Sequence, residues 1–276
     1  AAARQARVRE VVFTALHEFM GPVARLVYPL KARREGQWVD VRPQPGVRPF
    51  GELLREGAPK PVPVSPEDPA AYLYTGGTTG VPKAAVLTHR NLVANLLQAA
   101  SWDPQLRPGQ EVALAVLPFF HSYGMTSVLN FSMWLGATVV LVPRFDPKLV
   151  LDAVRRHRPT LFHGVPTMYI ALLNTPELKR VSFRSVRAGI SGAMGLPREV
   201  QRQWEAVTGG RLVEGYGLTE ASPVTHCNPL YGVRKEGSIG VPVPDTDARV
   251  VDPETGAPLP PGEVGELEVR GPQVMR

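Results

Sequence analysis

The sequence contains a single cysteine, Cys227, among its 276 residues, and aromatic residues make up only 7% of it. One cysteine cannot form a disulfide framework, and such sparing use is typical of a reducing compartment. No apolar run reaches the roughly 20 residues of a membrane-spanning helix, and no secretory signal pattern is recognised. The sequence therefore indicates neither a disulfide-stapled module nor a membrane-spanning protein.

Neither sign of charge dominates the sequence. It has 31 Lys and Arg residues against 25 Asp and Glu residues, a net charge of +6. This excess permits attraction to nucleotide or membrane phosphates without requiring either. No basic face interleaved with aromatic residues is found, so we expect no nucleic-acid partner. The hydrophobic content of 43% is sufficient for a packed core in one large domain or two.

The two ends of the sequence resemble cuts. The chain begins Ala1-Ala2-Ala3 and stops at Arg276, directly after a strand-like segment at 265–270. Native termini more often trail off in polar residues. We therefore expect an internal piece of a longer protein.

Strand-like and helix-like segments alternate through the central part of the chain, residues 70–230. Such alternation is typical of an α/β fold with a mostly parallel sheet and helices on both faces. Strands are expected at 70–74, 84–87, 112–117, 137–142, 161–165, 185–190 and 211–213, and helices at 91–100, 149–156, 167–173 and 199–206.

The flanking parts of the sequence differ in texture from the centre. Residues 8–30 have helical apolar spacing interrupted by Gly21-Pro22, and 40–69 are a proline-rich connector with a short element at 50–54. After residue 230, turns separate short alternating strands, which is typical of an antiparallel barrel. We expect three parts: 1–69, 70–230 and 231–276.

The segment Tyr74-Thr75-Gly76-Gly77-Thr78-Thr79-Gly80-Val81-Pro82-Lys83 combines three glycines, three threonines and a lysine. Glycine lets backbone N–H groups approach an anion, threonine adds hydroxyl donors, and lysine adds a point charge. These groups suit a polyphosphate. Because the segment joins two expected strands and lacks G-x-x-x-x-G-K-[ST], it is not the phosphate loop of ordinary kinases and GTPases.

Two further segments follow expected strands. One is the small-residue segment Ser191-Gly192-Ala193-Met194. The other is EGYGLTE at 214–220, in which glycines allow close backbone approach, Tyr216 offers a ring for stacking, and Glu220 offers an oxygen ligand for Mg²⁺. Loops beyond the carboxyl ends of parallel strands are the usual ligand crevice of such sheets.

These motifs, with PFFHSYG at 118–124 between them, occur in the order and at the distances typical of one family. The chain resembles the adenylate-forming superfamily of acyl-CoA synthetases, luciferases and peptide-synthetase adenylation domains, and is most similar to bacterial long-chain fatty acid–CoA ligases. The resemblance covers nearly the whole chain. It implies a layered αβαβα subdomain followed by part of an antiparallel β-barrel.

The resemblance also implies roles for individual residues. Catalytic roles fall to Lys83, His121, Thr219 and Glu220. Thr75 and Glu220 match magnesium positions. The β- and γ-phosphates match Thr75, Gly76, Gly77, Thr78, Thr79, Gly80 and Lys83. The α-phosphate matches Thr219. The adenine cleft matches Gly192, Ala193, Met194, Glu214, Gly215 and Tyr216. The wall between nucleotide and acyl tail matches His121, Ser122 and Met125.

Some residues depart from the family pattern or fall outside it. Many relatives have glycine at Ala193, and one branch has a gating tryptophan at Met125.

An apolar tunnel for the acyl tail is expected near His121. The residues expected to line it are Phe119, Phe120, Tyr123, Met125, Met133 and Trp134. A structural role is expected for His17, His157, His163 and His226, and a position at the start of a helix for His89.

The activity implied by the resemblance is ATP-dependent conversion of a carboxylic acid to acyl-AMP and then to acyl-CoA. ATP, Mg²⁺ and CoA are the expected cofactor and co-substrates, and a long-chain fatty acid is the expected acid. Aryl-acid and short-chain branches stay open, as does an inactive nucleotide-binding fragment. Because the family's ribose-binding aspartate and lysine-bearing C-terminal domain would follow Arg276, we expect residues 1–276 alone to be inactive. The expected location is cytoplasmic, with peripheral membrane contact and a homodimer left open.

Overall fold

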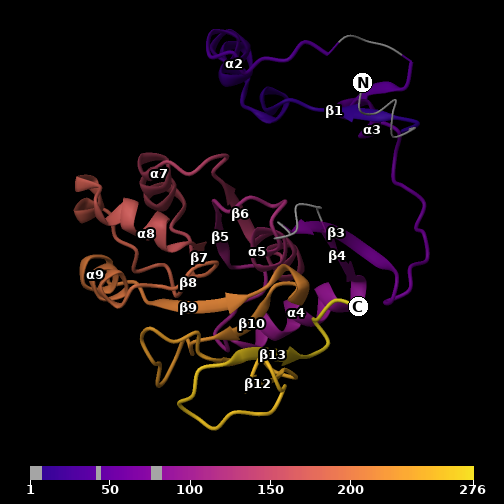
Figure 1. Cartoon of the computed structure of the whole chain (residues 1–276). Coiled ribbons are helices and arrows are strands. Elements are labelled where there is room, and N and C mark those ends of the chain that lie inside the picture. Colours follow the sequence, from indigo (N-terminus) through magenta and orange to yellow (C-terminus); the bar gives the residue numbers. More distant parts are fainter. Residues whose placement is uncertain (1–7, 42–44, 76–82) are drawn as a thin grey trace. The chain divides into compact units, whose positions relative to one another are not determined.

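The structure is a computed structural model of the chain and describes residues 8–41, 45–75 and 83–276 (Figure 1). The chain divides into two compact units, residues 1–63 and 64–276, and each is described by itself. None of the described helices combines the length and apolar composition needed to cross a bilayer. The boundaries expected at residues 69 and 230 stay predictions.

The first unit contains two short parallel strands, β1 (Val11–Phe13) and β2 (Val47–Pro49). Between them lie the 3-10 turn η1 (Leu16–Phe19) and helix α2 (Pro22–Arg34), and α3 (Phe50–Leu53) follows β2.

The helix expected over residues 8–30 is therefore wrong in its first half. The β-branched run at β1 pairs with β2 instead of continuing the helical spacing. Pro22 occupies the first turn of α2, where its missing N–H costs nothing, so Gly21-Pro22 starts a helix and does not interrupt one.

The second unit is built on a seven-stranded sheet with the order β11-β10-β9-β8-β7-β5-β6. Strands β5, β6, β7, β8 and β9 are parallel. At one edge, β10 pairs antiparallel with β9, and β11 pairs antiparallel with β10. Their bounds are Val112–Ala115 (β5), Thr138–Leu141 (β6), Leu161–Gly164 (β7), Ala188–Ser191 (β8), Leu212–Gly217 (β9), Val224–Cys227 (β10) and Val241–Pro242 (β11). The mostly parallel sheet expected from the sequence is confirmed.

Successive residues of the central strands pack into two different cores. In β7, Leu161 joins the core beside the helices α4 (His89–Ser101) and α6 (Phe131–Leu135). Phe162 joins the core that contains residues of α7 (Pro147–His157), α8 (Pro166–Leu173) and α9 (Arg198–Thr208). Ala113 and Leu114 of β5 divide in the same way. Because side chains alternate across a strand, the two cores cover opposite faces of the sheet (Figure 1).

The helices lie close to their expected positions. They are α4 (His89–Ser101), α7 (Pro147–His157), α8 (Pro166–Leu173) and α9 (Arg198–Thr208). The 3-10 turn η3 (Pro176–Arg180) was not predicted. His89 is the first residue of α4, as predicted, because the Thr88 hydroxyl caps the helix by accepting from Asn91 N–H at 3.2 Å. A continuous helical run that was not predicted consists of α5 (Ser122–Gly124), the π-helical η2 (Met125–Asn130) and α6 (Phe131–Leu135).

An antiparallel pair precedes the sheet and another follows it. β3 (Pro69–Thr75) and β4 (Lys83–Thr88) are paired, as expected for strands on either side of the glycine- and threonine-rich segment. β12 (Asp247–Val251) pairs with β13 (Glu266–Arg270). The antiparallel texture after residue 230 is thus confirmed, but within residues 231–276 these strands form no closed barrel.

Three buried amide side chains on one face of α4 join distant parts of this unit. Asn91 donates to the carbonyls of Pro272 and Val274 at 2.8 and 2.9 Å. Gln98 donates to the Pro244 carbonyl at 2.7 Å. The same helix face therefore supports both β10 and the C-terminal segment.

Asn95, completely buried between these two amides, forms the connection to β10. Its Nδ2 donates to the Val224 carbonyl at 2.8 Å, and its Oδ1 accepts from Val224 N–H at 3.0 Å. The two bonds satisfy both backbone groups of Val224 where the β9–β10 register shifts.

We predict that Asn95→Leu lowers the free energy of unfolding by about 3 kcal/mol, because Val224 N–H and C=O would be left buried without partners. Val93→Ala on the same helix is the control, because Val93 is 53% exposed. Urea unfolding of both variants measures the difference. Equal stabilities would show that the Asn95 bonds do not hold β10.

His163 is a polar exception in the buried strand β7. It is 8% exposed, and its Nδ1 has no hydrogen-bond partner among the described residues. Burial lowers its pKa from 6.5 to about 4, because the charged imidazolium is poorly solvated there. The ring is therefore neutral at physiological pH.

This burial predicts a measurable loss of stability in acid. Between pH 6.5 and about 4 the unfolded chain binds a proton at His163 that the folded chain does not, so stability falls as pH falls through this window. His163→Met should remove about 3 kcal/mol of this acid loss. Chemical unfolding at several pH values measures it, with His157→Gln as the exposed histidine control. Parallel pH profiles for wild type and His163→Met would contradict the assigned burial.

Candidate functional site

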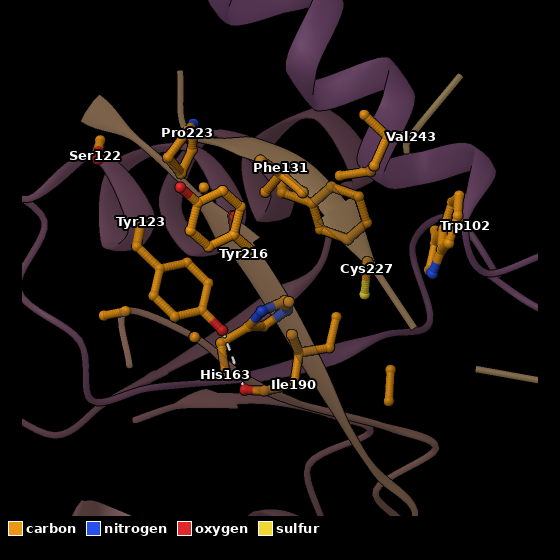
Figure 2. A pocket seen from close by; sticks show the side chains of 18 of the residues that line it. Trp102, Ser122, Tyr123, Phe131, His163, Ile190, Tyr216, Pro223, Cys227 and Val243 are labelled. Atoms are coloured by element: carbon orange, nitrogen blue, oxygen red, sulfur yellow. Dashed lines mark hydrogen bonds between the residues drawn. The ribbon is translucent and has the colours of Figure 1, made fainter. Parts of the chain in front are cut away.

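A cavity of about 210 Å³ opens at the carboxyl ends of the central strands (Figure 2). Strand β8 and the turn after it line it together with β9, the start of η4 (Thr219–Ala221), the helical run after His121, and α4. The carboxyl edge of a parallel sheet is where ligands are expected to bind, and the structure places the cavity there.

The β3–β4 hairpin carries the first group of predicted site residues. Thr75 and Lys83 are paired in register at the end of the hairpin next to residues 76–82. There the Thr75 hydroxyl donates to the Lys83 carbonyl at 3.4 Å. Lys83 is exposed. The predicted phosphate residues Gly76, Gly77, Thr78, Thr79 and Gly80 lie outside the described residues.

Thr219 and Glu220 lie on η4, which packs against β4. Thr219 lines the cavity, whereas Glu220 does not. The Glu220 carbonyl accepts from Met275 N–H at 2.7 Å, so the C-terminal segment fixes its backbone. The contact between η4 and β4 brings the second predicted magnesium residue to the strand that begins at Lys83.

The turn after β8 places Gly192 and Ala193 on the cavity wall, whereas Met194 is 62% exposed and does not line it. A Cβ at Gly192 would lie 3.0 Å from the Tyr123 ring, so any larger residue there would have to displace that ring. Ala193 has φ +67°, a left-handed conformation that favours glycine, which gives a physical reason for the glycine expected there in relatives.

The EGYG part of EGYGLTE is not the loop that the sequence analysis expected. Glu214, Gly215, Tyr216 and Gly217 belong to β9, which runs to Gly217 and pairs with β10. A Cβ at Gly217 would lie 2.0 Å from the Pro223 carbonyl oxygen. Gly217 therefore leaves room for the backbone of Pro223 and not for a ligand. Pairing with β10 continues β9 through residues where a ligand-binding loop was expected.

Within β9 the side chains have distinct environments. Gly215 and Tyr216 line the cavity, and the Tyr216 ring lies 6.2 Å from the His226 ring, edge to face. Glu214 is buried, and burial raises the pKa of its carboxyl, an effect that the Leu196 N–H partly offsets.

His121 begins the helical run at the other side of the cavity. Its Nδ1 accepts from Tyr123 N–H at 3.1 Å, so a neutral ring carries its proton on Nε2. His121 and Ser122 line the cavity, whereas Met125 does not. A Cβ at Gly124 would lie 2.2 Å from the Pro118 carbonyl oxygen, which explains the final glycine of PFFHSYG.

The cavity brings together seven of the predicted site residues from three separate segments. Thr75, Lys83, Met125, Met194, Glu214 and Glu220 lie outside its lining. Those that line it are His121, Ser122, Gly192, Ala193, Gly215, Tyr216 and Thr219.

The expected apolar tunnel is largely wrong in its residues. Phe120, Met133 and Trp134 are 85%, 72% and 52% exposed. Phe119 packs against the sheet core, and of the six expected residues only Tyr123 lines the cavity. Without knowledge of the helical run at 122–135, the sequence could not show which side chains point inward.

The apolar lining comes mainly from residues that sequence reasoning missed. It includes Trp102, Phe131, Ile190, Cys227, Leu230 and Val243.

His163, expected to be structural, also lines the cavity. The signal that could have revealed it is a histidine near the end of an otherwise apolar buried strand. Asp103 reaches the lining too, but Arg187 Nη2 lies 3.1 Å from its Oδ2, so the carboxylate is paired.

The cavity therefore has two chemically different parts. Glycine backbone, hydroxyl groups and the His121 ring form one part, next to η4. Apolar side chains from α4, α6, β8 and β10 form the other. Such a site suits a molecule with a polar head and an apolar body.

Comparison with known proteins agrees with this arrangement. A family model described as AMP-binding enzyme matches residues 10–276. A long-chain-fatty-acid–CoA ligase from Bacillus subtilis is 42% identical over 273 residues, which are 98% of this chain and 49% of that protein. 4-Coumarate–CoA ligase 2 from Oryza sativa subsp. japonica is 39% identical over 245 residues, 84% of this chain and 42% of that protein.

The crystal structure of ATP-bound MatB from Rhodopseudomonas palustris matches with a TM-score of 0.78 at 32% identity. The match covers 100% of this chain and 53% of that one. The chain thus spans about half the length of the curated relatives that it matches. The family match and the fold confirm the resemblance drawn from the sequence motifs: the chain belongs to the AMP-binding enzyme family of adenylate-forming acyl-CoA ligases.

Proposed function

We propose that the protein catalyses ATP-dependent activation of a carboxylic acid to acyl-AMP and then to acyl-CoA, with a long-chain fatty acid as substrate. The observation that carries this proposal is the joining, in one cavity, of a polar end beside η4 and β4 with an apolar wall under α4 and α6. ATP and the acid carboxylate fit the polar end, and an acyl tail fits the apolar wall.

The chemical difficulty is that a carboxylate must attack a phosphate that is itself anionic. Lys83, exposed at the start of β4, supplies a positive charge toward the phosphates. Thr219 donates its hydroxyl to the α-phosphate from the cavity wall. His121, with its proton on Nε2, donates toward the reacting carboxylate. Catalysis then rests on charge stabilisation and positioning.

The residues present suit a magnesium ion. Thr75 and Glu220 offer hydroxyl and carboxylate oxygens, the donors that Mg²⁺ prefers. Among the described residues no cluster of three or more metal-binding side chains exists. When bound, the ion would offset phosphate charge, and Thr75 and Glu220 would hold it.

A second candidate substrate is an aromatic acid. The rice relative is named a 4-coumarate–CoA ligase, and the cavity wall includes Trp102, Tyr123, Phe131 and Tyr216, on which a ring could pack.

We place the protein in the cytoplasm. Peripheral membrane contact and a homodimer are further hypotheses. Because the chain spans about half the length of its curated relatives, the assays below use the complete gene product, called the full-length enzyme.

Lys83→Ala should slow acid-dependent ATP–pyrophosphate exchange by about 2–4 kcal/mol of barrier, as expected for a removed oxyanion donor. Exchange of labelled pyrophosphate into ATP, with palmitate as the acid, measures this step without CoA. Lys148→Ala, an exposed lysine on α7, is the matched control. Equal rates for the two variants would remove Lys83 from the mechanism.

Glu220→Gln should raise the Mg²⁺ concentration required for half-maximal exchange, since it replaces a charged oxygen ligand with a neutral one. The exchange rate is measured across a magnesium series, beside a thermal melt of the same sample. Glu263→Gln, at an exposed carboxylate, is the control. A lower melting temperature with an unmoved magnesium curve would make Glu220 structural only.

A further inference from the structure

The apolar part of the cavity contains polar side chains that the mechanism above does not use. His163 Nδ1 and the hydroxyl oxygen of Ser127 are buried and have no hydrogen-bond partner among the described residues, and both side chains line the cavity. His163 is 8% exposed and Ser127 is 4% exposed. The two atoms themselves have almost no accessible surface, but both side chains border the cavity. Buried polar groups without a partner destabilise a fold, so an imidazole on the cavity wall without a hydrogen bond at Nδ1 points to a ligand that completes the ring from the cavity side.

The protein's own hydroxyl groups near His163 are already engaged. The Tyr123 ring lies 5.9 Å from the His163 ring, edge to face, but its hydroxyl donates to the Ile190 carbonyl at 3.0 Å (Figure 2). The Tyr169 hydroxyl lies 3.2 Å from the carbonyls of Ile190 and Phe162. Neither tyrosine therefore satisfies the imidazole.

The strand register fixes the depth of His163 in the cavity. His163 pairs with Ile190, and Gly164 with Ser191, so His163 lies two residues before the level of Gly192. At about 3.3 Å per residue, this places it roughly 7 Å deeper than the Gly192 turn. A group in contact with His163 would then belong to the tail of the acid and not to its carboxylate.

We propose that His163 is a specificity-determining residue that hydrogen-bonds an oxygen function on the tail of the acid. The substrate class is an oxygenated acid, with a hydroxyl or keto group along its tail, in preference to the pure hydrocarbon acid. A neutral imidazole offers one donor and one acceptor, so it can bind either group. This inference rests on the proposed acid activation at the same site.

The test compares palmitate with hydroxypalmitates that carry the hydroxyl at successive carbons, using acid-dependent ATP–pyrophosphate exchange by the full-length enzyme. We expect kcat/KM to favour one hydroxypalmitate over palmitate by about tenfold, because a site built for a hydroxyl rejects the analogue that lacks it. His163→Phe should abolish or reverse this preference, whereas Cys227→Ala in the same cavity should change both acids alike.

His163→Met provides a second variant whose unbranched side chain adapts to the available space. Thermal melts identify any variant that is not folded. If wild type and both His163 variants give the same ratio for every hydroxypalmitate, or wild type prefers palmitate to all of them, the assignment of His163 is overturned while acid activation stands. Absence of exchange with every acid would overturn the proposed function and this inference with it.

Discussion

Burial of both faces of the parallel sheet is the constraint on which the rest of the second unit depends. Phe162 packs into the core on one face, whereas Leu161 and His163 lie on the other face of β7 and line the cavity. The cavity therefore opens at the carboxyl edge, where backbone ends and loops are available for binding, and continues along this one face under α4 and α6. The same burial makes any polar residue in these strands conspicuous, as at His163.

The antiparallel edge strand completes the site and depends on close backbone approach. Gly217 leaves room for the Pro223 carbonyl, and Asn95 of α4 satisfies both backbone groups of Val224. Strand β10 is thereby held against β9, and η4 between them carries Thr219 into the cavity. The residues that support the site and those that line it are therefore parts of one hydrogen-bonded arrangement.

The sequence predicted the parallel sheet, because apolar runs are local signals. Its glycine-rich motifs and the family resemblance that they carry pointed to seven residues that line the cavity. It missed what depends on long-range pairing. β9 continues through Glu214 to Gly217 because β10 pairs with it, and Val11–Phe13 is a strand because β2 pairs with it. The apolar lining was missed for a similar reason: Phe131 points inward and Trp134 outward only once the helical run at 122–135 is known.

The most direct test of this account is a crystal structure of the full-length enzyme with a non-hydrolysable acyl-adenylate analogue. We expect the adenine beside Ala193 and Tyr216, the phosphate analogue at Thr219, and the acyl tail against Ile190 and His163. An adenylate bound away from the carboxyl edge of the sheet would contradict the account. So would an acyl tail that leaves the cavity between α4 and β8 unfilled.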